Sequence, residues 1–175
     1  MSFRRKILFL ALVVALFLPH SSRASSLIEY EVKASFLYNF TKFVDWPSSA
    51  RRGDFSICVI GKDYFGNALD SLKDKEVDGD AIEIKNTNQY NKSLGCNIAF
   101  ISKSEGKSVG DIIKEINGDP VLTVSDISDF AKNGGMLELR SEGEKVSISA
   151  NPSSAKKSDI KISSRLLNLA NIEGN

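Results

Sequence analysis

Two cysteines, Cys58 and Cys96, are the residues whose type and spacing most clearly predict chemistry. An even pair in an oxidising compartment favours a disulfide, and the alternative is two separate buried thiols, because free cysteine is among the most buried residue types. The bond would close a loop of about forty residues and stabilise the fold by about 4 kcal/mol in the chain-entropy model. No C-x-x-C spacing marks a redox site, so the expected role is structural.

The first 24 residues have the pattern of a cleavable export signal. Three basic residues at positions 4 to 6 precede an apolar run from Ile7 to Leu18, and Ser22-Arg23-Ala24 forms a small-x-small cleavage site. The run is shorter than the roughly 20 residues of a spanning helix; an uncleaved anchor is the alternative. We therefore expect residues 1–24 to be removed and residues 25–175 to form one periplasmic domain that does not insert into the membrane.

The mature chain lacks the residues of the commonest catalytic sites. Cleavage would remove His20, the only histidine, and leave 19 basic against 22 acidic residues. Ser-His and Cys-His pairs and histidine-bound metals are thereby excluded, and a nucleic-acid surface is disfavoured. The acid pairs Asp126 with Asp129, and Asp78 with Asp80, fall in loops and are weak evidence for acid-base chemistry. We expect no enzyme, no cofactor and no metal.

Aromatic residues are concentrated between Glu29 and Pro47. Stepping 100° per residue from Ile28 places a set of apolar side chains in one half of a helical wheel. The set is Ile28, Val32, Phe36, Leu37, Phe40, Phe43 and Val44. We therefore predict an amphipathic helix that ends at Trp46, because Pro47 disfavours helical backbone in the residue before it.

Two polar residues, Asn39 and Lys33, interrupt this apolar half. Asn39 falls between Ile28 and Val32 on the wheel, so we expect it to be buried and either to bond nearby backbone or to line a pocket. Lys33 can extend its amino group to solvent. The candidate pocket or partner surface therefore consists of Asn39, Lys42, Asp45 and Trp46. The alternative for Trp46 is a purely structural place in the core.

The rest of the chain alternates strands with helices. Phe55–Ile60, 97–101 and 120–124 are apolar runs typical of strands buried on both faces. Helices are expected at 65–73 and 108–116, a hairpin at 136–150, and a final helix from about Ser153 that carries Leu166, Leu167, Leu169 and Ala170. This pattern predicts an α/β single-domain sandwich, in which a mixed, mainly parallel sheet is flanked by helices and followed by a C-terminal hairpin and helix.

Five motifs, in order, resemble those of the YfiR/HmsC family. They are VKASFLYNFTKFVDWP, ICVIG, GCNIAFIS, VLTVSD and KISSRLLNLA, and they span about residues 30 to 170. The resemblance implies a periplasmic regulator that represses an inner-membrane diguanylate cyclase through the periplasmic domain of the cyclase. Repression would lower cyclic-di-GMP signalling and biofilm formation. A homodimer and an outer-membrane OmpA-like lipoprotein as a further partner are also implied.

Cys58 and Cys96 match one cysteine pair of that family. A second pair seen in some members is absent, and Ala131 and Glu138 lie near its expected place. The family has no catalytic residues to transfer. The alternative function is a periplasmic small-ligand-binding protein that feeds a membrane sensor, with its pocket near Asn39 and Trp46.

Overall fold

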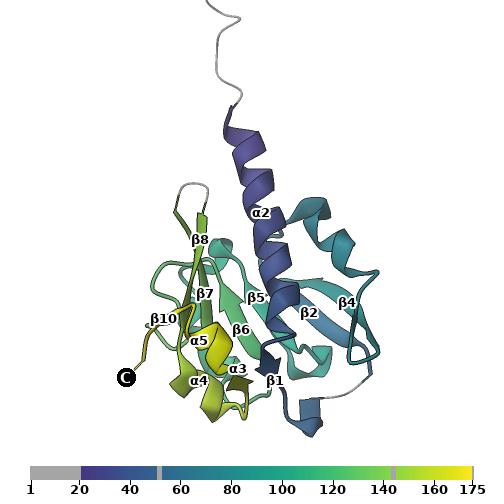
Figure 1. Cartoon of the computed structure of the whole chain (residues 1–175), viewed down its shortest axis with the longest axis vertical. Helices are drawn as coiled ribbons and strands as arrows, with labels where there is room; N and C mark the ends of the chain where they lie inside the picture. The colour runs from purple at the N-terminus through teal and green to yellow at the C-terminus, as the bar shows by residue number, and fades with distance from the viewer. Residues whose placement is uncertain (1–20, 51–52, 143–144, 175) are drawn as a thin grey trace, which may run out of the picture.

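An eight-stranded sheet with helices on both faces organises the chain (Figure 1). The computed structural model describes residues 21–50, 53–142 and 145–174. The strands are β1 (Val44–Asp45), β2 (Phe55–Ile60), β3 (Glu76–Val77), β4 (Asp80–Thr87), β5 (Ile98–Ile101), β6 (Leu122–Ser125), β7 (Leu137–Glu142), β8 (Lys145–Ala150), β9 (Lys161–Ile162) and β10 (Asn171–Ile172). The helices are α2 (Ser21–Phe40), α3 (Val109–Ile116), α4 (Pro152–Lys157) and α5 (Ser164–Leu167), with 3-10 turns η2 (Ser48–Ala50), η3 (Gly66–Leu72), η4 (Lys92–Leu94) and η5 (Lys103–Glu105).

The sheet is mixed and mainly parallel, which confirms the predicted fold class. Its order is β10-β8-β7-β6-β5-β2-β4-β3, and the block from β7 to β4 is parallel. The hairpin strands β7 and β8 pair antiparallel. Chain order reverses between β2 and β5, which makes the carboxyl ends of these strands the usual ligand position in an open α/β sheet.

The central strands are apolar on both faces because helices cover both. All six residues of β2 are buried. Ile57 and Val59 belong to a core shared with α2, η3, α4 and α5, whereas Cys58 and Ile60 belong to a second core shared with α3. The sequence pattern therefore correctly predicted these strands.

Helix α2 presents a different face to the sheet than the wheel predicted. Its fully buried residues are Tyr30, Lys33, Ala34, Leu37 and Phe40, while Ile28 is 62% exposed. Asn39, expected to be buried, is exposed, and this prediction was wrong. The wheel failed because it counted Lys33 as polar. The amino-terminal part of α2 also projects beyond the sheet (Figure 1), where Ile28 has little to pack against. The predicted cleavage site at residues 22–24 lies at the start of α2, and the rest of the predicted export signal, residues 1–20, lies outside the described part of the chain.

The helix also ends earlier than expected. Backbone bonds at Thr41, Lys42 and Phe43 reach back three residues and tighten the last turn after Phe40. Val44 and Asp45 then pair antiparallel with Ile162 and Lys161. Strand pairing with a segment far along the chain therefore replaces the predicted last helical turn.

The predicted single C-terminal helix is wrong. The chain instead forms α4, the short strand β9, α5 and the edge strand β10. Asp159 adopts a left-handed backbone with φ of 55°, which ends helical geometry after α4 and directs Ile160 into the core. Leu169, assigned to an apolar helix face, is 77% exposed.

Replacing either of two glycines by alanine should change the free energy of unfolding, in opposite directions. A Cβ at Gly135 would overlap the ring of Phe130, which is fully buried, so Gly135→Ala should lower the free energy of unfolding by about 1–3 kcal/mol. A Cβ at Gly110, exposed in α3, meets no atom within 4 Å. Gly110→Ala should raise that free energy by about 0.5–1 kcal/mol through helix propensity. Urea unfolding of both variants measures the difference, and equal midpoints would contradict it.

Candidate functional site

Three of the four predicted site residues line one cavity. Lys42, Asp45 and Trp46 border a hollow of about 290 Å³. Its other walls come from the amino-terminal ends of β2, β4 and β5 and from the turns before them, and include Phe55, Val77, Asp78, Asp80 and Asn97. Asn39 does not line it. The cavity thus lies at the end of the sheet opposite the usual α/β ligand position.

Trp46 is held in place at the wall of this cavity. Its indole Nε1 donates to the carbonyl of Asn97 at 3.0 Å, and its ring meets the ring of Phe55 edge-on at 5.2 Å. With its N–H satisfied, the indole offers an apolar surface in a fixed orientation. Trp46 is half-buried and belongs only partly to the core.

A second cavity, of about 400 Å³, lies beyond the same residues. It is lined by Asp45, Trp46, Pro47, Lys156, Asp159, Ile160 and Lys161. Pairing of β1 with β9 brings these two parts of the chain together. Asp45 and Trp46 therefore contribute to two hollows, either of which can receive a small molecule or a side chain from a partner.

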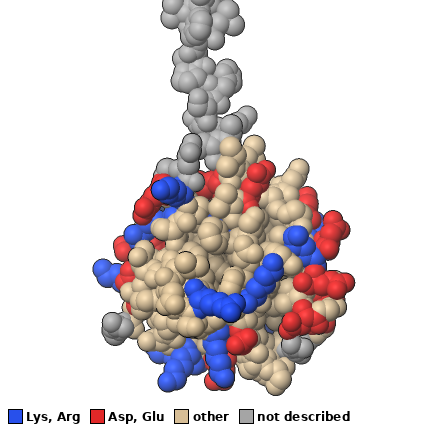
Figure 2. Space-filling view, viewed as in Figure 1, with Lys and Arg blue, Asp and Glu red and all other residues tan. Residues whose placement is uncertain are grey.

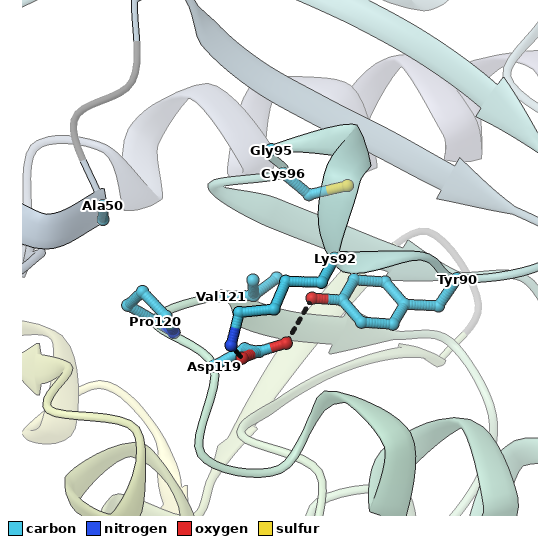
Figure 3. A pocket seen from close by; sticks show the side chains of 8 residues that line it. All are labelled: Ala50, Tyr90, Lys92, Gly95, Cys96, Asp119, Pro120 and Val121. Carbon is cyan, nitrogen blue, oxygen red and sulfur yellow. Dashed lines mark hydrogen bonds and ion pairs between the residues drawn. The ribbon is translucent and has the colours of Figure 1, made fainter.

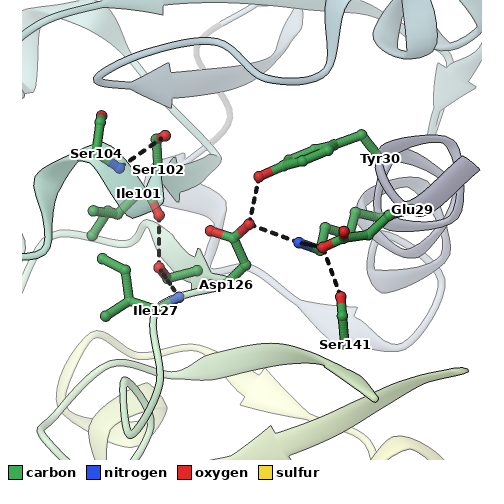
Figure 4. A network of polar contacts seen from close by, with 10 residues as sticks. Glu29, Tyr30, Ile101, Ser102, Ser104, Asp126, Ile127 and Ser141 are labelled. Atoms are coloured by element: carbon green, nitrogen blue, oxygen red, sulfur yellow. Dashed lines mark hydrogen bonds and ion pairs between the residues drawn. The ribbon is translucent and has the colours of Figure 1, made fainter. Parts of the chain in front are cut away.

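A buried polar network lies at the opposite, carboxyl end of the strands (Figure 4). The Lys33 Nζ donates to Asp126 Oδ2 at 2.7 Å, and their side chains are only 2% and 3% exposed. Asp126 directly follows β6, and Lys33 reaches it from α2. An ammonium and a carboxylate so far from water are tolerated only as a pair.

The hydroxyl of Tyr30 and the carboxylate of Glu29 extend this network. Tyr30 donates to Asp126 Oδ2 at 2.7 Å, while Glu29 accepts from Lys33 at 2.5 Å and from Ser141 at 2.7 Å. Burial, followed by the bond to Asp126, raises the pKa of Tyr30 well above its ordinary value. Partial burial of Glu29 opposes ionisation, but the bonds from Lys33 and Ser141 outweigh it and lower its pKa.

This network attaches α2 to the sheet. Tyr30 and Lys33 occupy the position where an open α/β sheet usually binds its ligand, so their side chains fill that crevice. Asp126 Oδ1 has no hydrogen-bond partner among the described residues. Burial of Lys33 was not predicted, although its spacing from Tyr30 and Leu37 follows the helical repeat. Asp129, expected beside Asp126 as an acid pair, is exposed and stands outside the network.

Cys58 and Cys96 are joined by a disulfide, the first of the two alternatives. Cys58 lies within β2 and Cys96 two residues before β5, so the bond ties neighbouring strands. Beside it, Tyr90 donates to Asp119 at 2.8 Å, and Lys92 forms an ion pair with the same carboxylate (Figure 3). Only a very small hollow of about 10 Å³ remains there, which suits a structural role for these side chains.

Ala131 and Glu138, near the expected place of a second cysteine pair, do lie against each other. The Ala131 amide donates to Glu138 Oε2 at 3.3 Å. Arg140 donates to the other carboxylate oxygen at 2.9 Å, and this contact raises the pKa of the guanidinium above its ordinary value. A buried, paired carboxylate therefore occupies this position. Ala131 and Glu138 are both buried.

Two features are absent from the described ranges 21–50, 53–142 and 145–174. No group of three His, Cys, Asp or Glu side chains is arranged there to hold a metal ion. No helix in those ranges is long and apolar enough to cross a membrane.

Comparison with protein families gives one match that covers most of the chain. A family model described as YfiR/HmsC-like matches residues 30–171. The matched region begins at Tyr30 in α2 and ends at β10, so it contains both cavities, the polar network and the disulfide.

Proposed function

Since the chain belongs to the YfiR/HmsC-like family, we propose that it is a regulatory protein that binds and represses an inner-membrane diguanylate cyclase. The family consists of periplasmic regulators of such cyclases. The match over residues 30–171 carries the proposal. Repression would act through the periplasmic domain of the cyclase and lower cyclic-di-GMP and biofilm formation. A homodimer and an outer-membrane OmpA-like lipoprotein that sequesters the protein belong to the same proposal.

The surface around Trp46 supports a role in binding. The indole is fixed by Asn97 and Phe55 and stands beside both cavities. Aromatic side chains in such fixed positions are frequent energetic centres of protein interfaces. These observations support our proposal that the partner surface or its controlling ligand site includes Asp45 and Trp46.

Deleting the gene should raise cyclic-di-GMP and surface attachment. The reason is that the cyclase would lose its inhibitor. Cyclic-di-GMP in cell extracts, measured by mass spectrometry, checks the result. Complementation with the natural gene should restore the low level, and complementation with Trp46→Ala should restore it less well, provided that immunoblots show equal amounts of both proteins.

The same deletion in a strain without the cyclase is the control and should change nothing. Unchanged cyclic-di-GMP in a strain that retains the cyclase would overturn the proposed repression. Full complementation by Trp46→Ala would leave the family role intact but would contradict the surface assigned to it.

The cavities themselves favour a second candidate function, a periplasmic small-ligand-binding protein that feeds a membrane sensor. Trp46 is the only tryptophan, so its fluorescence reports on both hollows. A ligand that changes this fluorescence and raises the melting temperature, with no cyclase bound, would favour this candidate.

A further inference from the structure

The C-terminal segment forms a basic face on the side of the sheet covered by α2. Four cations, Lys156, Lys157, Lys161 and Arg165, occur in α4, β9 and α5. Two carboxylates lie beside them, Asp159 within the segment and Asp45, whose strand β1 pairs with β9 at Lys161. Each of the four is exposed. Figure 2 shows basic side chains gathered over the centre and lower part of this face, where Figure 1 places α4 and α5. The predicted mature chain has an excess of three acidic residues, so the basic charge is locally segregated.

These four cations are not engaged in ion pairs with residues of the described part of the chain. Within the described ranges none of them takes part in an ion pair, whereas Lys73, Lys92 and Lys114 each do. Unpaired charges of one sign raise the local potential and attract an anionic surface. The face therefore keeps its charge available for an outside partner.

An exposed leucine accompanies the cations. Leu169 follows Arg165 by four residues, and backbone bonds from Asn168 to Ser164 and from Leu169 to Leu166 continue the helical turn of α5. Residues four apart on such a turn are neighbours, so Leu169 lies beside Arg165. Its side chain is 77% exposed, the largest exposure among the large apolar residues described. An apolar side chain beside cations is typical of surfaces that lie on a membrane.

We propose that α4, β9 and α5 bind the anionic head groups of a phospholipid membrane, with Leu169 in contact with the acyl boundary. Three of the four cations are lysines, which are depleted in protein interfaces but attract lipid head groups without a fixed geometry. Each such residue near an anionic membrane strengthens binding by about fivefold. Four of them give reversible, salt-sensitive binding, and the protein lies on the membrane rather than spanning it. The inference goes beyond the proposed function, since it concerns lipid and requires no cyclase.

Vesicle co-sedimentation of the purified, processed protein tests the proposal. Vesicles of phosphatidylglycerol with phosphatidylethanolamine should bind the protein, and vesicles of phosphatidylcholine alone should not. Binding should fall as salt is raised. Lys156→Glu/Lys157→Glu/Lys161→Glu should weaken binding by at least about a hundredfold, and Leu169→Ser by several-fold without any change of charge.

Lys107→Glu/Lys114→Glu/Lys132→Glu is the charge-matched control, because these exposed lysines belong to the side of the sheet covered by α3. This control should retain most of the binding, and thermal unfolding should confirm that all variants fold. Equal binding to both vesicle types, or equal loss in the two triple variants, would overturn the proposal. Absence of binding to the anionic vesicles would overturn it too, and loss of cyclase binding in the first triple variant would then make this face a protein interface. If the protein does not bind vesicles, the result of the gene-deletion experiment is unaffected. Lipid binding and cyclase repression can therefore be contradicted separately.

Discussion

Replacing Lys33 by methionine should lower the free energy of unfolding by about 3–5 kcal/mol. The substitution leaves the Asp126 carboxylate, only 3% exposed, without its cationic partner and with the Tyr30 hydroxyl as its remaining donor. Methionine keeps most of the apolar stem of lysine, so the cost arises from the unpaired charge rather than from a cavity. Urea unfolding followed by circular dichroism measures the effect, and a loss below about 1 kcal/mol would contradict the burial of this pair.

Lys114→Met is the matched control for this experiment. Lys114 also belongs to a helix and also pairs with an aspartate, Asp111, but both side chains are at least 80% exposed. Exposed pairs contribute about 0–1 kcal/mol, so this variant should unfold almost like the natural protein. Replacing the whole cluster, by Tyr30→Phe/Lys33→Met/Asp126→Leu, should cost less than Lys33→Met alone, because no buried charge is then left unpaired.

Removing the disulfide is the second large expected effect. Cys58→Ala/Cys96→Ala should lower the free energy of unfolding by about 2–5 kcal/mol, since the bond restricts the unfolded chain over a separation of 38 residues. The natural protein, unfolded in urea with and without dithiothreitol, gives the contribution of the crosslink alone. The double variant adds the effect of losing two buried sulfur atoms.

Dithiothreitol should not change the unfolding of the double variant, which serves as the control. In the natural protein the disulfide should become accessible to reductant only on unfolding, because Cys58 is fully buried and Cys96 is 6% exposed. Two free thiols in unreduced protein isolated from cells, counted by mass spectrometry, would show that the bond does not form in the cell.

The central strands could be predicted because their signal is local. Phe55–Ile60 is a short apolar run that ends at Gly61, and helices on both faces of the sheet require that pattern. Glycine also fits the turn there, since Gly61 has φ of 90°. Lys42, Asp45 and Trp46, three of the four residues predicted as a pocket or partner surface, border one hollow, and their role in binding stays a prediction.

The polar network could not be predicted because Lys33 and Asp126 are 93 residues apart. A helical wheel assigns lysine to solvent, and only the arrival of β6 beside α2 supplies the partner that makes its burial tolerable. The same reasoning applies to Asn39, which was expected to be buried by its place on a wheel that was centred on the wrong face.

Features that depend on residues close together in the sequence could be predicted, whereas features that depend on contacts between distant segments could not. The sequence by itself determined the apolar strands, the α/β class, the cysteine pair and the family, since these depend on runs and motifs of neighbouring residues. Only the tertiary structure decided where α2 ends, which of its faces is buried and how the C-terminal segment folds. Val44 is not helical but pairs with Ile162 in a short antiparallel ladder. This pairing places Trp46 beside two cavities and brings the basic face next to them. Contacts between distant segments outweigh local propensity there, because burial and pairing contribute more free energy than the preference of one turn for helix.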